Sequence, residues 1–487
     1  MASAPTIFIS AWRNPSVRYL LYSDVFQVLK DSGARLVIFL RDEDLGHFAP
    51  RLEAGNVLCR PVYMAQALAQ LKGTRLGRWL LLANTRLSGT DGSQRNLTAE
   101  ARIYLHDYNF RGGWRAQLID NAAIALGRLA SQSRALRRGL VALQDRLFPG
   151  RFYDPYFQEF QPRLLVTSSV GYSIDPFFMR AAHRHHCPVA AIVHSWDNPT
   201  AKGFRAARPD AVIAWNHQMA QELAVYQDID PGIISVEGVA HWDYYFDGSL
   251  RPRPRPEFLA SLGLAPQRRL IFYGSSAPKN FPHTFDALEW LAKGLAENRF
   301  AEPAQLLVRL HPAYFVSKGQ GRVLEAYQGR IEALERDYGG LVRFAHPSIE
   351  SLAGGLDMPK ADMLELAETL GHADVLLTEY STLMIEAAIL DRPVINVSLF
   401  QYRDTARPAK FFETYTHLQP VLESGACRNA YSFDQLQEML GGYLRDPALD
   451  RANRARLVDK MIPVNRGRAG RAVGQRLLDL AGVAQKV

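Results

Sequence analysis

The stretch ADVLLTEYSTLMIEAAILDRPVINVSLF, residues 373–400, decides the fold that we predict for this chain. Residues 375–377 form a short apolar run without polar alternation, which is typical of a strand buried on both faces of a parallel sheet. A polar turn at 379–382 leads into a helix predicted for 383–390, and a second buried strand follows at 394–397. Ligands of open α/β sheets bind beyond the carboxyl ends of the strands, so the turn is a candidate binding site.

This turn carries groups that suit a phosphate. A helix that begins here presents free backbone N–H groups and the positive end of its dipole. Tyr380, Ser381 and Thr382 add hydroxyl groups, and Glu386, one helical turn after Thr382, could reach a ribose diol. The alternative is that Ser381 only caps the helix and that Glu386 is solvated.

Composition limits the class of protein. A chain of 487 residues predicts two or three domains, and 47% hydrophobic with 22% charged residues is typical of a globular protein. The net charge of +8 suits phosphate-bearing or anionic partners, including an anionic membrane surface. The sequence has no zinc finger, no RNA-binding aromatic signature and no long basic tail, so we expect no nucleic acid partner.

The location follows from what the sequence lacks. Its three cysteines are too scattered for a disulfide framework or a zinc site, which favours a reducing cytoplasm. We find no signal peptide, and the segment that comes nearest to a membrane span, residues 76–83, is far too short to be one. We therefore expect a cytoplasmic protein, with peripheral binding to the inner face of the cytoplasmic membrane as a further option.

The N-terminal part begins with a β–α–β pattern: a strand at 5–10, a helix at 17–32 and a strand at 35–40. The turn after the first strand carries Trp12, Arg13 and Asn14, on the rim where a ligand would bind. There is no G-x-G-x-x-G, so the dinucleotide fingerprint is absent. A later strand at 164–167 ends at Ser168 and Ser169.

Residues 71–151 predict a helical insertion that is both apolar and basic. Arginines at 128, 134, 137, 138, 146 and 151 alternate with leucines at 126, 129, 136, 140, 143 and 147. A solvated helix face explains this pattern, and so does docking on an anionic membrane or on a lipid-linked acceptor.

The loop HSWDNPTAKG, residues 194–203, follows a buried strand predicted at 189–193. It gathers an imidazole (His194), a carboxylate (Asp197), an amide (Asn198) and an ammonium group (Lys202). A carboxylate here could take a proton from an acceptor hydroxyl during attack on an activated carbon. The alternative for Asp197 is an Asp turn that orders the loop through its own backbone.

A proline-rich linker, SLRPRPRP at 249–256, separates the two halves. A second β–α–β series follows the linker, and polar residues come directly after each of its strands, on the rim of the sheet. These rims carry Ser275, Ser276 and Lys279, then Arg309 and His311, then His346. Together with the 379–386 turn they predict a site for a nucleotide diphosphate, although His311 could simply end its strand as a structural histidine.

The predicted fold is therefore α/β, with two doubly wound Rossmann-like domains that face a cleft. The first domain covers 1–248 and includes the helical insertion, the second covers 257–450, and 451–487 adds C-terminal helices that could return to the first domain. No carboxylate pair on a rim indicates a divalent ion, so we expect neither a metal nor another cofactor. Basic groups and the helix dipole could stabilise a departing diphosphate instead.

Five collinear stretches resemble a known family. They are HSWDNPTAKG (194–203), VEGVAHWDYY (236–245), LIFYGSSAP (270–278), LVRLHP (307–312) and DVLLTEYSTLMIEA (374–387). The chain resembles glycosyltransferases of the GT-B fold, and within them the clan of CDP-glycerol glycerophosphotransferases and of capsule and lipopolysaccharide glycosyltransferases. The resemblance implies that the second domain binds the donor nucleotide and that the first binds the acceptor.

The polar rims, read with this division of the two domains, give the site residues that we expect. Donor-binding residues are Ser275, Ser276, Lys279, Arg309, His346, Tyr380, Ser381, Thr382 and Glu386. Acceptor-binding residues are Arg13, Asn14, Ser169, Trp196, Asn198 and Lys202, and the catalytic groups are His194, Asp197 and His311.

Two departures from the family pattern shape the expected reaction. Teichoic acid enzymes carry a His-Gly-Thr-Pro loop where this chain has Asp197, and an Asp where it has Glu379. Both departures favour a transferred sugar over glycerol phosphate. We therefore expect an inverting bacterial glycosyltransferase that acts on a lipopolysaccharide or capsule glycan, with Asp197 as the base. A CDP-polyol transferase, a nucleotide-sugar epimerase and a catalytically silent binding protein are the alternatives.

Overall fold

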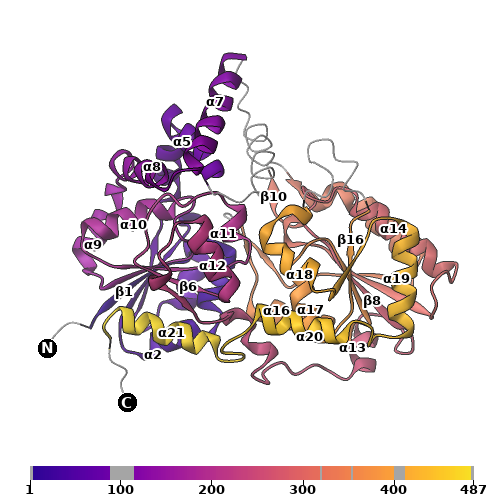
Figure 1. Cartoon of the computed structure of the whole chain (residues 1–487). Coiled ribbons are helices and arrows are strands. Elements are labelled where there is room, and N and C mark those ends of the chain that lie inside the picture. Colours follow the sequence, from indigo (N-terminus) through magenta and orange to yellow (C-terminus); the bar gives the residue numbers. More distant parts are fainter. Residues whose placement is uncertain (1–3, 88–113, 319–320, 353–354, 400–411, 484–487) are drawn as a thin grey trace. The chain divides into compact units, whose positions relative to one another are not determined.

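The computed structural model describes residues 4–87, 114–318, 321–352, 355–399 and 412–483 (Figure 1). Its contacts divide the chain into two compact units. The first unit is Met1–Asp243 with Thr414–His417 and Ile462–Val487, and the second is Tyr244–Glu413 with Leu418–Met461.

The first unit is built on a seven-stranded parallel sheet of order β3-β2-β1-β4-β5-β6-β7. Its strands are β1 (Thr6–Ser10), β2 (Arg35–Leu40), β3 (Val57–Pro61), β4 (Leu164–Thr167), β5 (Val189–Ile192), β6 (Ala211–Ala214) and β7 (Ile234–Val236). The central strand β1 pairs Ile7 with Leu36 on one side and with Leu164 on the other, and every residue of β1 is buried. Phe8, Phe39, Phe157 and Phe178 pack together in the core of this unit.

Helices connect these strands. They are α1 (Asn14–Ser16), α2 (Asp24–Asp31), α3 (Leu45–Leu52), α4 (Met64–Lys72), α5 (Arg75–Leu87), α7 (Trp114–Ser131), α8 (Arg134–Leu147), α9 (Asp154–Phe160), α10 (Asp175–Arg184), α11 (Asn198–Ala201), α12 (His217–Tyr226) and α21 (Ala469–Leu480).

The second unit repeats this architecture with a six-stranded parallel sheet of order β12-β9-β8-β15-β16-β17. Its strands are β8 (Arg269–Gly274), β9 (Ala304–Arg309), β12 (Val342–Ala345), β15 (Val375–Thr378), β16 (Val394–Val397) and β17 (Cys427–Ala430). Two small antiparallel pairs are β10 (Ser317–Lys318) with β11 (Gly321–Arg322), and β13 (Glu350–Ser351) with β14 (Leu356–Asp357). Its helices are α13 (Arg255–Ser261), α14 (Thr284–Ala296), α15 (Gln328–Asp337), α16 (Lys360–His372), α17 (Leu383–Ile389), α18 (Gln419–Glu423), α19 (Phe433–Arg445) and α20 (Arg451–Met461).

The predicted pair of doubly wound domains is confirmed, whereas some element boundaries are wrong. The helix expected at 17–32 is interrupted: a π-helix, Val17–Leu21, ends before Ser23, whose side chain caps α2 by accepting from Val25 N. The apolar segment 233–239 also predicts a strand, but strand β7 is confined to Ile234–Val236, since residues 231–233 form a 3₁₀ turn. Strands β3 and β17 were not predicted.

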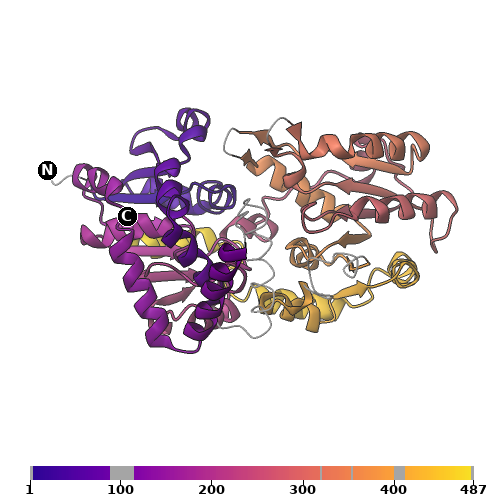
Figure 2. The same ribbon diagram turned by 90° about the horizontal axis from the view of Figure 1, so that it is seen from above.

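The C-terminal helix α21 belongs to the first unit, where it packs on α2. In both views the yellow helix lies among the elements of that unit (Figures 1 and 2). A Cβ at Gly474 would lie 2.7 Å from Cβ of Val28, so this close helix contact requires glycine. Asp243 caps α21, since its carboxylate accepts from Ala469 N at 2.9 Å and from Gly470 N at 2.7 Å.

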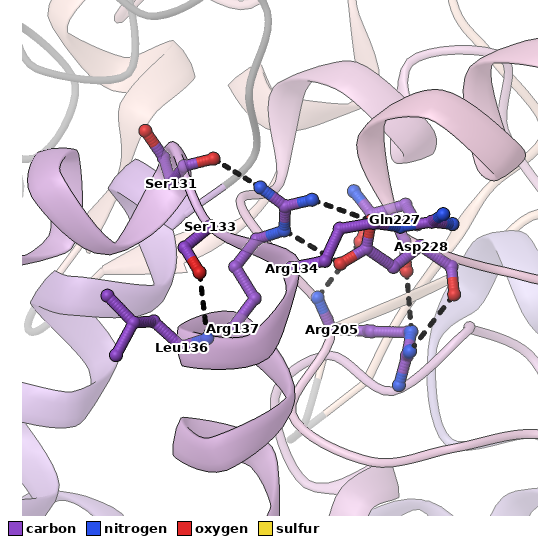
Figure 3. A network of polar contacts seen from close by, with 8 residues as sticks. All are labelled: Ser131, Ser133, Arg134, Leu136, Arg137, Arg205, Gln227 and Asp228. Carbon is purple, nitrogen blue, oxygen red and sulfur yellow. Dashed lines mark hydrogen bonds and ion pairs between the residues drawn. The ribbon is translucent and has the colours of Figure 1, made fainter.

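Helices α5, α7 and α8 form the described part of the predicted insertion; residues 88–113 of it lie outside the described residues (Figure 1). Asp228 anchors α8 to the sheet loops: Arg137 donates to both of its carboxylate oxygens at 2.7 Å, and Arg134 pairs with it at 3.3 Å (Figure 3). Since only 11% of the Arg137 side chain is exposed, a solvated face is the wrong interpretation for this arginine.

Candidate functional site

The second unit gathers its polar residues where the strand order reverses, between β8 and β15. Glu379, directly after β15, is fully buried there and joins the two strand ends. Its carboxylate accepts from Tyr273 Oη at 2.5 Å, from Ser276 N at 2.7 Å and from Thr284 Oγ1 at 3.1 Å. Burial raises the pKa of Glu379 to about 7, although these hydrogen bonds oppose the shift.

The first unit has a corresponding carboxylate between β1 and β4, where its own strand order reverses. Asp175, at the start of α10, accepts from Ser10 Oγ (3.2 Å), Trp12 Nε1 (2.9 Å) and Ser169 Oγ (2.5 Å). Burial raises its pKa as well, against the effect of these bonds. Each unit therefore has one buried acid that fixes the strand ends where doubly wound sheets bind ligands.

His311, Ser275 and Ser276 come together at the ends of β8 and β9. Ser275 Oγ accepts from the backbone N of His311 at 2.9 Å, and Ser276 Oγ donates to the carbonyl of Glu379. His311 Nδ1 accepts from Ala313 N at 3.0 Å, and burial lowers the pKa of the imidazole to about 4. His311 is therefore neutral at pH 7, with its proton on Nε2 as a possible donor.

The 380–386 turn is more strongly engaged by the protein than the sequence predicts. Tyr380, at φ 45°, bonds Ser398 Oγ (2.6 Å) and Glu413 Oε1 (2.7 Å) through its hydroxyl. Ser381 Oγ accepts from Leu383 N, the first residue of α17, at 3.2 Å, while Thr382 is the N-cap residue and makes no side-chain cap bond. Glu386 is buried, accepting from Tyr245 Oη at 2.8 Å and Thr382 Oγ1 at 3.3 Å, so the solvated alternative is wrong.

Of the other predicted donor residues in the second unit, Arg309 is buried, whereas Lys279 and His346 are exposed. Arg309 is 8% exposed and pairs with Asp362 at 2.5 Å, while its Nη1 has no hydrogen-bond partner. Lys279 and His346 lie on exposed loops after β8 and β12. The structure therefore makes Arg309 part of a buried ion pair, which the sequence did not reveal.

In the first unit, Asp197 lies on the loop between β5 and α11, and both of its carboxylate oxygens are engaged. Ser195 Oγ donates to Oδ1 at 2.5 Å, and Lys202 Nζ lies 2.8 Å from Oδ2. Burial alone would raise the pKa of Asp197, but Lys202 leads the groups that lower it well below its usual range. The side chain makes no cap bond to the loop backbone, so the proposed Asp turn is wrong.

His194 lies at the start of the same loop. Its Nδ1 bonds the carbonyl of Ser168, and burial lowers its pKa to about 4. Since a carbonyl only accepts, Nδ1 carries the proton and Nε2 is the acceptor. His194 is thus a neutral imidazole beside the end of β4.

His417 is a member of this cluster that sequence reasoning missed. Its Nδ1 bonds Thr200 Oγ1 at 2.9 Å, and its ring meets Trp196 edge to face at a centroid distance of 5.1 Å. Burial lowers its pKa to about 4, so it too is neutral at pH 7. Because more than two hundred residues separate His417 from Thr200, no local motif could have indicated the contact.

The other predicted acceptor residues of the first unit lie on neighbouring strand ends. Arg13 and Asn14 are half-buried in the turn after β1. Ser169 is buried after β4 and holds Asp175, and Asn198, also buried, begins α11. The predicted donor residues all belong to the second unit, and the predicted acceptor residues all belong to the first.

The described residues offer neither a metal site nor a membrane-spanning helix. Within the described ranges, no three His, Cys, Asp or Glu side chains are grouped so that they could hold a metal ion. None of the described helices is long and apolar enough to cross a bilayer. The three cysteines are free and buried.

Comparisons with known proteins give structural matches alone. No family model and no curated protein matches the sequence. A UDP-N-acetylglucosamine 2-epimerase matches with a TM-score of 0.51 and 12% identity, over 100% of this chain and 98% of its own. S. aureus MnaA, in a structure with UDP, matches with a TM-score of 0.51 and 10% identity, over 99% of this chain and 98% of its own. A glycosyltransferase from Rickettsia africae ESF-5 covers 100% of both chains, at 10% identity and a TM-score of 0.49.

At these identities the likeness concerns the fold. The expected resemblance is confirmed at that level: the chain has the GT-B fold, which glycosyltransferases and nucleotide-sugar epimerases share. The likeness leaves the reaction to be argued from the chain's own residues.

Proposed function

We propose that this protein is a metal-independent glycosyltransferase that moves a sugar from a nucleotide-activated donor to a bacterial surface glycan, a lipopolysaccharide O-antigen or a capsule. The observation that carries the proposal is the reversal point of the second unit. Ser275, Ser276 and His311 meet there at the ends of β8 and β9, beside the turn that begins α17. Such a point in a doubly wound sheet is the usual place for a nucleotide.

In this proposal the second unit holds the donor's diphosphate. His311 donates from Nε2 to a phosphate oxygen, and backbone N–H groups near Ser381 add further donors. Lys279 and His346 reach the diphosphate from exposed loops, while Tyr380, Thr382, Glu386 and Arg309 shape the pocket. The departing nucleoside diphosphate is stabilised by these preorganised groups, which is why the reaction needs no metal ion.

The first unit supplies the base and the acceptor site. Asp197 is ionised at neutral pH, so it can accept a proton from an acceptor hydroxyl. The bond from the acceptor oxygen to the anomeric carbon forms as the bond from that carbon to the phosphate oxygen breaks, and the stereochemistry inverts. His194, Trp196 and Lys202 orient the acceptor around Asp197.

A donor screen tests the proposal. Nucleotide sugars and CDP-polyols are compared by thermal shift, since a ligand that binds only the folded chain stabilises it. Sugar transfer is then measured for Asp197→Asn and His311→Asn, with the exposed Asp31→Asn as the control. We expect both site variants to lose transfer while the control keeps it. Unchanged transfer in both site variants would reject the assigned roles.

An epimerase is the second candidate, favoured by the fold match to a UDP-N-acetylglucosamine 2-epimerase. Such an enzyme converts its donor without an acceptor, so product formed from the donor alone identifies it. Stabilisation by a CDP-polyol and not by a nucleotide sugar would instead indicate a polyol-phosphate transferase. An absence of turnover with every donor would indicate a binding protein.

Peripheral contact with an anionic membrane, carrying a lipid-linked acceptor, is part of the proposal. Its support is that helices α7 and α8 of the insertion expose both leucines and arginines: Leu118, Leu126, Leu129, Leu136, Leu143, Arg128, Arg138 and Arg146. The double variant Leu126→Gln/Leu129→Gln should lose sedimentation with anionic vesicles. Val225→Gln, which changes an exposed apolar residue outside the insertion, should retain it. No sedimentation of the natural chain at physiological salt would reject the contact.

A further inference from the structure

Arg13 places a positive charge at the carboxyl end of β1. Its guanidinium carbon lies 4.4 Å from the centroid of the Trp12 ring, and the residue is half-buried. Among the described residues, none forms a hydrogen bond or an ion pair with this guanidinium. Burial lowers the pKa of Arg13, so the folded chain bears a cost for holding the charge there.

The surroundings hold this cation in place, and Asp175 and Asp197 act on it electrostatically without a hydrogen bond or an ion pair to it. Trp12 cannot move freely, because its Nε1 donates to Asp175 at 2.9 Å. Arg41, after β2, donates to the carbonyl of Trp12 at 3.0 Å and adds a second positive charge close to Arg13. The nearby acids are engaged elsewhere: Asp175 by three hydrogen-bond donors, and Asp197 by Lys202 and Ser195.

Neighbouring strand ends supply buried polar atoms that have no hydrogen-bond partner in the protein. They are Ser16 Oγ after β1, Ser168 Oγ after β4 and Asn198 Nδ2 after β5. Asn198 is 2% exposed, and Tyr172 connects it to Arg13: the Tyr172 hydroxyl donates to the Asn198 carbonyl at 2.9 Å and lies within electrostatic reach of the guanidinium. A buried polar group without a partner is unfavourable, so three of them at neighbouring strand ends need an explanation.

We propose that this part of the first unit, the Arg13 site, binds an oxyanion carried by the acceptor, a phosphate or a carboxylate group. Arg13 supplies the charge and a fork of N–H donors that matches an oxyanion, and Asn198 Nδ2 supplies a further donor. Asp197 is close enough to Arg13 to act on it electrostatically, and it lies on the loop that carries Asn198. In the proposal, a hydroxyl of the same acceptor therefore reaches Asp197, the base. The inference rests on the proposed transferase function and adds to it that the acceptor is anionic.

A local reporter tests the site without knowledge of the acceptor. The chain is labelled with 5-fluorotryptophan, and the ¹⁹F signal of Trp12 is assigned with Trp12→Phe. Inorganic phosphate and acetate are titrated separately, with chloride at matched ionic strength as the reference. Because the Arg13 guanidinium stacks on Trp12, an oxyanion at Arg13 should shift this signal in a saturable way. The stronger of the two probes identifies the acceptor group as phosphate or carboxylate.

Variants decide the outcome. Arg13→Gln should weaken binding at the Trp12 signal about tenfold to a hundredfold, the effect of one charged hydrogen-bonding group. Arg13→Lys should weaken it less, and Arg35→Gln, an exposed arginine at the start of β2, should leave it unchanged. The inference is overturned if phosphate and acetate shift the Trp12 signal no more than chloride does. It is also overturned if either oxyanion binds Arg13→Gln as tightly as it binds the natural chain.

The inference and the proposed function fail separately. If the protein transfers sugar but neither oxyanion shifts the Trp12 signal, the proposed function stands and an anionic acceptor is rejected. If an oxyanion shifts the Trp12 signal in a saturable way but the protein turns over no nucleotide sugar, the anion site stands and the transferase function is rejected.

Discussion

Lys202 Nζ lies 2.8 Å from Oδ2 of Asp197, and the two side chains are 44% and 23% exposed. A partly exposed ammonium group thus holds a candidate base ionised at the end of β5. An ionised carboxylate is ready to accept a proton, but a low pKa makes it a weak base. The ion pair therefore sets how low the pH can fall before Asp197 is protonated.

Lys202→Met should raise the pKa of Asp197. Burial raises this pKa, and Lys202 is the largest of the effects that lower it, so its removal leaves burial less opposed. The acid limb of the pH profile of kcat/KM should therefore move to higher pH. Lys293→Met, at an exposed pair with Glu297, is the control and should leave the limb in place. An unmoved limb in Lys202→Met would mean that Asp197 is not the titrating group.

Glu379 should make stability depend on pH. Its pKa in the folded chain is about 7, above the value of about 4.3 for an unfolded glutamate. The folded state binds this proton more tightly, so the stability that it contributes is complete below the unfolded value and is lost as pH rises through 7. Glu379→Gln does not titrate.

The free energy of unfolding, measured with urea from pH 5 to pH 8, should fall for the natural chain relative to Glu379→Gln as pH rises. The exposed Glu332→Gln serves as the control and should parallel the natural chain. A constant difference between the natural chain and Glu379→Gln across this range would show that burial does not raise the pKa of Glu379.

The central strands were predictable from sequence, whereas β3 and β17 were not. The central strands are buried on both faces, so VAAI (β5) is apolar throughout and VLLT (β15) has a single polar residue, Thr378, at its end. Strands β3 (VLCRP) and β17 (CRNA) lie at sheet edges, where one side has no strand partner and polar residues or proline are tolerated. Apolar runs alone therefore miss them.

The site was predictable to the level of strand ends and not to the level of contacts. His311, Asp197 and Ser381 follow strands that the apolar pattern reveals. The contacts of Arg309 with Asp362 and of Thr200 with His417 depend on tertiary packing, because the two partners in each pair are far apart in sequence. Side-chain spacing within one segment holds no information about such pairs.

Asp362→Ala should destabilise the second unit. Arg309 and Asp362 side chains are 9% and 6% exposed, so loss of the acid leaves a buried cation alone, at a cost of about 3–5 kcal/mol. The double variant Arg309→Met/Asp362→Leu removes both charges and should be more stable than Asp362→Ala. Urea unfolding checks both. A double variant that is no more stable than Asp362→Ala would indicate that packing, and not the unpaired charge, dominates.

Phe204→Ala should loosen the insertion and the Asp197 loop together. Phe204, two residues after Lys202, is buried against Leu87 of α5, Ala130 of α7 and Val141 of α8, and its backbone N donates to Asn84 of α5 at 2.7 Å. Loss of a buried phenyl ring costs about 3–5 kcal/mol. Because the ring lies between the helices and the loop, amide hydrogen exchange should speed up both in α8 and in residues 198–203.

Phe300→Ala removes a similarly buried ring from the second unit and is the matched control. It should lower stability without faster exchange in residues 198–203. Faster exchange confined to α8 in Phe204→Ala would show that the insertion is held independently of the loop, and a partner bound to the insertion could then not act on Asp197 through Phe204.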